Sequence, residues 1–139
     1  MTRLFQIPAV PTLRDLSEKE WQRQIVELAK TVGFALIYHT YRSERSAAGY
    51  PDLVLVRERQ VVIEVKRETG KPSPDQCRWL QGLLAADIET YLVRPSDLPE
   101  LGVVLAARRH PGQPFTGPAA EAHALLHGRT LTAIGKEAA

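Results

Sequence analysis

Two short apolar segments, separated by only four polar residues, constrain the fold of this chain more than any other feature. Residues 53–56 and 61–63 consist entirely of Leu, Val and Ile, and the polar link at 57–60 is long enough only for a tight connection. Strands that are buried on both faces have this uninterrupted apolar character. The spacing therefore predicts a β-hairpin that runs through the centre of a sheet.

Three charged residues stand at the ends of these two segments. Asp52 directly precedes the first segment, and Glu64 and Lys66 follow the second with one residue between them. Side chains alternate between the two faces of a strand, so Glu64 and Lys66 project from one face while their apolar neighbours pack on the other. A hairpin brings Asp52 back beside Glu64, and the two carboxylates are predicted to be neighbours.

Two adjacent carboxylates repel each other and lose hydration when buried, so a cation is needed beside them. Mg²⁺ and Mn²⁺ take carboxylate oxygens and waters, whereas Zn²⁺ favours Cys and His, and the chain has a single Cys. We expect Asp52 and Glu64 to bind Mg²⁺ or Mn²⁺. The competing interpretation is that Asp52 caps a turn after Pro51 and that Glu64 and Lys66 form an ordinary ion pair.

The motifs of this region resemble those of the PD-(D/E)XK nucleases, and most closely those of the VRR-NUC (virus-type replication-repair nuclease) family. The Gly-x-Pro-Asp-Leu, Glu-x-Lys, Gly-Lys and Gln-x-x-x-Leu elements of that family match residues 49–53, 64–66, 70–71 and 76–80. The resemblance covers about residues 17–105. It implies an α/β fold with a restriction-endonuclease-like core, in which a central mixed β-sheet is flanked by helices, and hydrolysis of DNA phosphodiester bonds.

The metal chemistry of such a nuclease assigns roles to the hairpin residues. The backbone carbonyl of Val65 would join Asp52 and Glu64 in holding one or two cations, which lower the pKa of bound water and neutralise developing charge. Lys66 would place a compact positive charge beside the nucleophile, and would orient the attacking water or help to deprotonate it.

Two further site residues are predicted on helices, each with an alternative. The resemblance carries a helical glutamate onto Glu18, which shares the inward face of its helix with Gln22, whereas Glu20 lies on the solvent side. The alternative is that both glutamates only favour the positive end of a helix dipole. Gln76 matches the motif glutamine, but its position three residues after Ser73 also fits a capping box, which needs no catalysis.

Basic residues in loops or helix starts that adjoin the site are predicted to bind flanking phosphates. The formal net charge is only +2, so a DNA-binding surface must come from local clustering. For any single residue, a solvated surface charge is the alternative. The predicted DNA-binding residues are Arg42, Arg45, Arg67, Lys71 and Arg78.

The positions of Pro, Gly and helix-capping residues predict an N-terminal arm over residues 1–16, a nuclease domain over 17–107 and a flexible or partner-ordered tail over 108–139. Pro and Gly recur in the tail, where at most a short helix is expected. Besides the hairpin, the pattern predicts helices capped by Ser17 and Ser73, strands over 34–38 and 89–94, and a helix or strand over 101–106.

Stand-alone VRR-NUC proteins are similar to Holliday-junction resolvases, which act as homodimers, so the resemblance implies a metal-dependent, structure-specific DNA endonuclease that acts as a homodimer on branched DNA. The alternatives are a flap- or nick-directed nuclease and a non-catalytic DNA-binding module of a replication or repair complex. The chain has no signal-peptide pattern, no apolar run that could cross a membrane and no second Cys. We expect a cytoplasmic protein, bacterial or phage-encoded.

Overall fold

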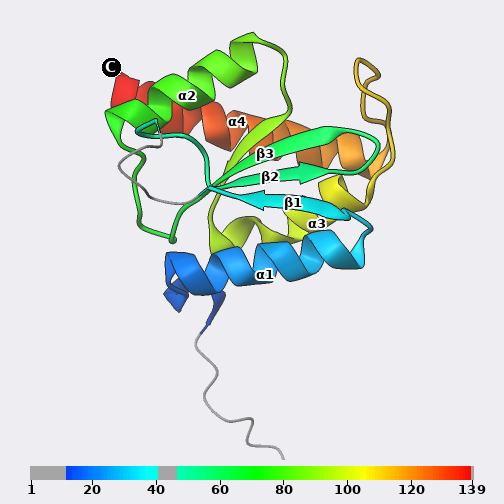
Figure 1. Ribbon diagram of the computed structural model, residues 1–139, viewed down its shortest axis with the longest axis horizontal. Helices are drawn as coiled ribbons and strands as arrows, with labels where there is room; N and C mark the ends of the chain where they lie inside the picture. The colour runs from blue at the N-terminus through cyan, green and yellow to red at the C-terminus, as the bar shows by residue number, and fades with distance from the viewer. Residues whose placement is uncertain (1–11, 41–46, 139) are drawn as a thin grey trace, which may run out of the picture.

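A mixed four-stranded sheet forms the middle layer of the computed structural model, which describes residues 12–40 and 47–138 (Figure 1). Neighbouring strands pair in the order β1-β2-β3-β4, with β1–β2 and β2–β3 antiparallel and β3–β4 parallel. The predicted hairpin and the predicted α/β fold with a mixed sheet are both confirmed. The strands are β1 (Leu36–His39), β2 (Leu53–Val56), β3 (Gln60–Val65) and β4 (Thr90–Val93).

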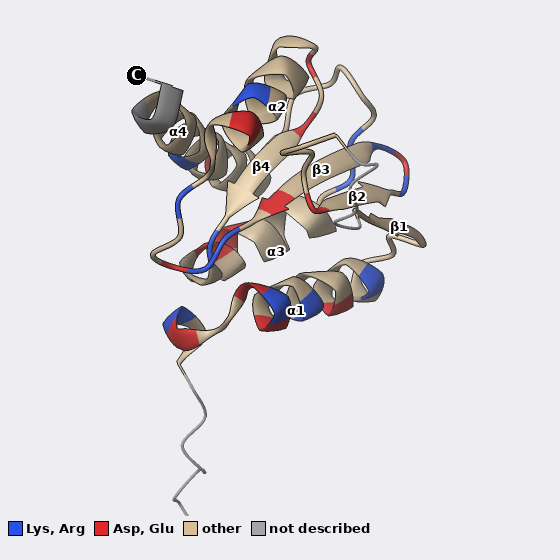
Figure 2. Cartoon of the chain, turned by 60° about the vertical axis from the view of Figure 1, so that its left-hand side comes forward, with Lys and Arg blue, Asp and Glu red and all other residues tan. Residues whose placement is uncertain are grey.

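Helices cover both faces of the sheet (Figure 1). On one face, α1 (Glu18–Thr31) and α3 (Leu98–Ala106) pack in one apolar cluster with alternate residues of the strands. On the other face, α2 (Pro74–Ala85) packs against Leu92 of β4. α1 is amphipathic as expected: Trp21, Ile25, Val26 and Ala29 are buried, and the blue and red segments of its ribbon in Figure 2 mark Lys, Arg and Glu at other positions.

Both predicted capping boxes are present. The Ser17 hydroxyl accepts a hydrogen bond from the Glu20 backbone N–H at 3.1 Å, and the Ser17 N–H donates to the Glu20 carboxylate at 3.0 Å. Ser73 and Gln76 repeat the arrangement at 3.2 Å and 2.9 Å. These reciprocal bonds satisfy N–H groups that a helix start leaves without partners, and they fix where α1 and α2 begin.

Three predicted segments change at their boundaries. The strand expected at 34–38 is β1, which begins two residues later, at Leu36. Phe34 is not part of it, because its N–H donates to the Ala29 carbonyl oxygen at the end of α1 and its side chain is buried in the core. Within the predicted arm, η2 (Leu13–Asp15) is a short 3₁₀-helix, while residues 1–11 lie outside the described residues. The segment at 101–106, expected as helix or strand, is helical and belongs to α3.

The prediction of a C-terminal tail is wrong, because α4 (Pro118–Ala138) is a long helix packed against α3, β4 and α2. The fully buried Thr130 hydroxyl accepts a hydrogen bond from the Leu92 N–H at 3.0 Å and donates to the Leu126 carbonyl oxygen at 2.8 Å. Edge strands expose unpaired backbone groups, and α4 covers the β4 edge. The Pro and Gly residues between 111 and 118, which suggested a tail, precede the buried part of this helix, and Gly128 and Gly135 lie within the helix.

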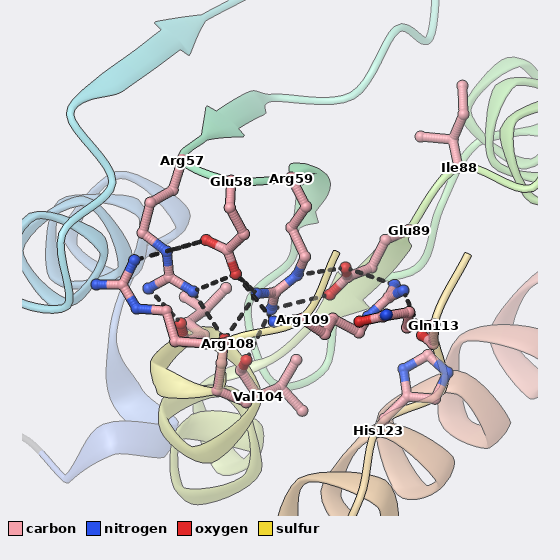
Figure 3. A network of polar contacts seen from close by, with 12 residues as sticks. Arg57, Glu58, Arg59, Ile88, Glu89, Val104, Arg108, Arg109, Gln113 and His123 are labelled. Atoms are coloured by element: carbon pink, nitrogen blue, oxygen red, sulfur yellow. Dashed lines mark hydrogen bonds and ion pairs between the residues drawn. The ribbon is translucent and has the colours of Figure 1, made fainter. Parts of the chain in front are cut away.

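The turn between β2 and β3 ties the ends of two helices to the sheet (Figure 3). The Arg57 guanidinium donates to the carbonyl oxygens of Val32 and Leu105 at 2.6 Å and 3.0 Å. Arg59 donates to the Val104 carbonyl oxygen at 2.8 Å. These carbonyls belong to the C-terminal ends of α1 and α3, where helices have acceptors without intrahelical partners and attract positive charge.

In the described part of the chain, no helix combines the length and the hydropathy that are needed to cross a bilayer.

Candidate active site

The register of the hairpin brings the predicted acids to one end of one sheet face. Leu53 pairs with Ile63, so Asp52 and Glu64, the next residues outward, lie opposite each other. The Asp52 Oδ2 atom accepts a hydrogen bond from the Val65 N–H at 2.8 Å, which holds this carboxylate against the β3 backbone. Glu64 is in register with Leu92, whose side chain packs against α2, so the acids belong to the α2 face.

Glu64 is the least satisfied polar side chain of this face. The residue is only 1% exposed, and among the residues that the structure describes neither carboxylate oxygen has a hydrogen-bond donor. The Lys66 Nζ atom lies 3.5 Å from Glu64 Oε2, close enough for an ion pair but without hydrogen-bond geometry. Burial, and then the charge of Asp52, raise the pKa of Glu64 to about 9, while Lys66 opposes the shift.

The donor set fits a hard divalent cation. Two carboxylates share the site. Both oxygens of Glu64 are buried and have no donor in the part of the chain that the structure describes, and a positive charge would satisfy them. Residues 12–40 and 47–138 contain no group of three or more His, Cys, Asp and Glu side chains that could hold a metal. A cation would therefore rely on Asp52, Glu64, backbone oxygen and water, which is usual for Mg²⁺ and unusual for Zn²⁺.

The structure does not gather Glu18 with these two acids. Glu18 is half-buried and Glu20 is exposed, the asymmetry that the helix register predicts. Gln22, one turn after Glu18, contacts the His39 ring of β1, with Nε2 and Nδ1 3.1 Å apart. His39 pairs with Leu53, whose side chain lies in the α1 core, so this contact belongs to the opposite face of the sheet. The assignment of Glu18 to the site stays a prediction.

Gly49 packs the Asp52 segment directly against the start of α2. Its φ angle is +87°, and a Cβ atom there would lie 2.4 Å from the Asp75 carbonyl carbon and 2.6 Å from the Gln76 nitrogen. Only glycine fits both the backbone conformation and the space. This close approach explains why a glycine precedes Pro51-Asp52, and sequence reasoning missed it because Gly49 gave no sign of its partner on α2.

Gln76 is used by the helix cap, as the alternative interpretation held. Its side-chain Oε1 atom accepts the Ser73 N–H at 2.9 Å. The side-chain amide nitrogen carries the remaining N–H donors, at a helix N-terminus that is packed against the segment leading to Asp52. The cap and a contact with substrate are therefore compatible, because they use different atoms of the same amide.

The family comparison agrees with this geometry. The VRR-NUC domain model matches residues 8–97, which is more than half of the chain. The chain belongs to the VRR-NUC family. No curated protein and no solved structure matches the chain. The VRR-NUC domain is a nuclease domain, so the function is nuclease-type processing of DNA, and the predicted family and enzyme class are confirmed at that level.

The predicted DNA-binding residues of this VRR-NUC chain have different outcomes. Arg42 and Arg45 lie outside the described residues. Arg67 and Lys71 are exposed in the loop that follows Lys66. Arg78 is also exposed, and its guanidinium donates to Asp75 at 2.6 Å in the first turns of α2. The structure leaves the exposed cations accessible to a phosphate, and their roles stay predictions.

A groove of about 630 Å³ lies between the loop after Lys66 and α4 of the VRR-NUC chain. It adds two cations that sequence reasoning did not select. Arg94 donates to the Gly70 carbonyl oxygen at 2.8 Å, and Arg129 of α4 pairs with Asp97 at 2.6 Å. Arg129 was missed because its segment was expected to be a tail, and α4 lies beyond the stretch that the family model matches.

Proposed function

We propose that this VRR-NUC chain is an endodeoxyribonuclease that depends on Mg²⁺ or Mn²⁺, with its centre at Asp52, Glu64 and Lys66. The observation that carries the proposal is the Glu64 carboxylate, which is buried beside a second acid and, within residues 12–40 and 47–138, has no hydrogen-bond donor. A buried polar group without a hydrogen-bond partner lowers the free energy of unfolding by about 1–3 kcal/mol, and by more if the group is charged. Such a group is retained where a ligand completes it.

The residues of the chain would divide the work of hydrolysis. Asp52, Glu64 and the Val65 carbonyl oxygen would hold the cation, and the Asp52 side chain is already positioned by the Val65 N–H. When bound, a divalent cation activates water and offsets the charge that gathers on the phosphate. The buried Lys66 ammonium, held on the same face by Glu64, would orient the attacking water and stabilise negative charge near it.

The start of α2 would contribute to substrate binding. Gln76 offers side-chain amide N–H groups there, and the positive end of the α2 dipole favours a phosphate oxygen. Arg67 and Lys71 would bind phosphates further along the strand, which predicts binding that weakens as salt rises. Glu18, on the helix that covers the other face of the sheet, would act as an outer-sphere group, through water.

We further propose that the substrate is branched DNA, cut by a homodimer in the manner of a Holliday-junction resolvase. Support for a dimer comes from β1, the other edge strand of the sheet. Leu36 and Tyr38 are 66% and 59% exposed there, and an edge strand with apolar side chains favours pairing with a second chain. Sedimentation of wild type and Tyr38→Asp would test it, since a charge at this edge should shift a dimer to monomer.

The test of function is cleavage of a labelled four-way junction, a flap and a linear duplex with Mg²⁺, Mn²⁺ or EDTA. We expect metal-dependent cleavage, with the junction cut most efficiently. Asp52→Asn and Glu64→Gln should abolish cleavage, while Glu121→Gln, which changes an exposed acid on α4, should not. Preference for the flap would identify a flap- or nick-directed nuclease. Binding of DNA without cleavage of any substrate would identify a non-catalytic module.

A further inference from the structure

An aromatic pair joins the two segments that build the candidate active site. The Tyr50 and Trp79 rings lie edge to face, with their centroids 5.0 Å apart and an angle of 80° between the planes. Tyr50 stands two residues before Asp52, and Trp79 follows Gln76 by one turn of α2. The pair is therefore continuous with the site on the α2 face.

Trp79 lines an open hollow of about 410 Å³ on the outer side of α2. Leu83 and Gly82 follow it at positions that share one face of a helix, and the residues of α2 that pack into the core are on another face. A Cβ atom at Gly82 would meet nothing within 4 Å, so the space above this glycine is open. The remaining wall is Arg78, whose side chain is 74% exposed.

The chemistry of this hollow suits a flat aromatic ligand that carries negative charge at one end. It is lined by the Trp79 indole, the Leu83 side chain and the helix backbone at Gly82, and Arg78 stands at its edge. A nucleotide has this character, because every base has a π-face that stacks on aromatic side chains and is joined to a phosphate. Bases within a duplex are already stacked on both sides, so only an unpaired base can enter.

We propose that the hollow at Trp79, Gly82 and Leu83 binds an unpaired nucleobase of the DNA substrate, with Arg78 beside the adjoining phosphate. The inference rests on the proposed nuclease function and names a feature of its substrate. Trp79 is then a specificity-determining residue, which favours cleavage next to a gap, flap or branch over cleavage within continuous duplex. Tyr50 holds the indole in position for both the base and the Asp52 segment.

Tryptophan fluorescence can test this binding without any cleavage. The chain has two tryptophans, and Trp21 is 0% exposed with its indole N–H bonded to the Val93 carbonyl oxygen. Quenching by single-stranded oligothymidylate in EDTA would therefore report on Trp79, and Trp79→Phe should remove it. We expect quenching by the single strand and little by a blunt duplex of the same length.

Gly82→Leu is the decisive variant, because it fills the hollow without altering Trp79, Tyr50 or the packed face of α2. Loss of one base-stacking contact should weaken oligothymidylate binding by about 10-fold. Gly82→Ala adds only a methyl group and should retain binding. Gly102→Leu is the matched control, since Gly102 is a helical glycine of α3 that also has open space above it.

Cleavage assays with Mg²⁺ complete the test. Gly82→Leu should lose more activity on a flap or gapped substrate than on a blunt duplex, while Gly102→Leu should lose neither. Unchanged quenching in Gly82→Leu, or equal loss on both substrates, would overturn the proposal. Quenching that responds to Gly82→Leu in a protein that cuts no DNA would refute the nuclease function and leave the base-binding hollow standing.

Discussion

The two ends of the sheet bury charge in opposite ways. At the β2–β3 turn, Arg59 is 3% exposed and pairs with Glu89 at 2.7 Å and Glu58 at 2.9 Å (Figure 3). At the other end, Glu64 is equally buried, its cationic neighbour Lys66 lies at 3.5 Å, and among the described residues its carboxylate oxygens have no hydrogen-bond donor. The first set of charges is partnered by carboxylates and helix carbonyls, and the second is left incomplete.

This difference separates structural charge from functional charge. A buried ion pair contributes little net stability compared with apolar packing, yet removing one partner leaves an uncompensated charge and is costly. At an incomplete site, removing a charged side chain is expected to raise the stability of the fold, because it relieves desolvation and carboxylate repulsion. The Arg59 network is therefore expected to be needed for folding, and the Asp52–Glu64 pair to be needed for activity at the expense of stability.

Among the variants that test this contrast, Lys66→Ala gives the largest expected effect, and it concerns the functional end. We expect cleavage to fall by about 100- to 10,000-fold, the range for a positioned acid-base group. Metal binding by calorimetry should be retained, because Asp52, Glu64 and the Val65 carbonyl oxygen remain to hold the cation. The fold should be retained by circular dichroism, because without metal Glu64 can stay protonated when its ion-pair partner is gone. Lys19→Ala, at an exposed position of α1, is the control. Loss of metal binding instead would show that Lys66 is a structural partner of Glu64.

Arg59→Ala tests the structural end. The change removes one of the two arginine partners of Glu89 and a donor to α3, while Arg109 stays 3.0 Å from Glu89. We therefore expect the free energy of unfolding to fall by about 3 kcal/mol in urea denaturation, the lower end for a broken buried pair. Arg108→Ala, which removes an exposed arginine 3.8 Å from Glu58, should change it by about 0.5 kcal/mol or less. A loss of similar size in both variants would remove the distinction between the two ends of the sheet.

The pH dependence of stability should also have opposite signs at the two ends. In EDTA, Glu64 has a pKa of about 9 in the fold against an ordinary 4.5. Between these values only the folded state holds the proton, so the free energy of unfolding falls as pH rises from 4.5 toward 9. Arg57 holds the pKa of Glu58 below its ordinary value, so the stability that Glu58 contributes is present above pH 4.5 and is lost as pH falls below it.

Urea denaturation in EDTA between about pH 2.5 and 9 would measure both slopes, since each titration couples to unfolding. Glu64→Gln should flatten the decline at high pH and raise stability there, while Glu58→Gln should flatten the decline at low pH. If Glu64→Gln destabilises the protein at pH 8 without metal, the site is a completed ion pair and the contrast between the ends fails.

The functional end was largely predictable from the sequence, and the structural end was not. The hairpin that aligns Asp52 with Glu64 follows from alternation and a short link, which are local properties. The capping boxes at Ser17 and Ser73 are local too. The segment at 57–60, in contrast, looked like an ordinary polar turn, because the partners of Arg57 and Arg59 lie far away in the sequence, at the C-terminal ends of α1 and α3 and directly before β4.

The same reason explains the error at the C-terminus. Most of α4 is Ala, Gly, Thr and His, with few large apolar side chains to announce a core helix. A tertiary contact holds α4 in place: β4 is an edge strand, and its Leu92 N–H donates a hydrogen bond to the Thr130 hydroxyl of α4. Likewise, helix periodicity could predict that Glu18 is more buried than Glu20, but it could not place Glu18 relative to Asp52.

The smallest predicted effect concerns that pair of glutamates and asks how far the functional end extends. Glu20 bonds to Ser17 and is exposed, whereas Glu18 is half-buried beside Gln22. If Glu18 supports the site through an outer-shell contact, Glu18→Gln should reduce cleavage at limiting Mg²⁺ by about 10-fold, and high Mg²⁺ should restore it. Glu20→Gln keeps the cap and should leave cleavage unchanged. Equal behaviour of the two variants would place the boundary of the functional end at the α2 face, and Glu18 would then belong with the solvated charges of α1.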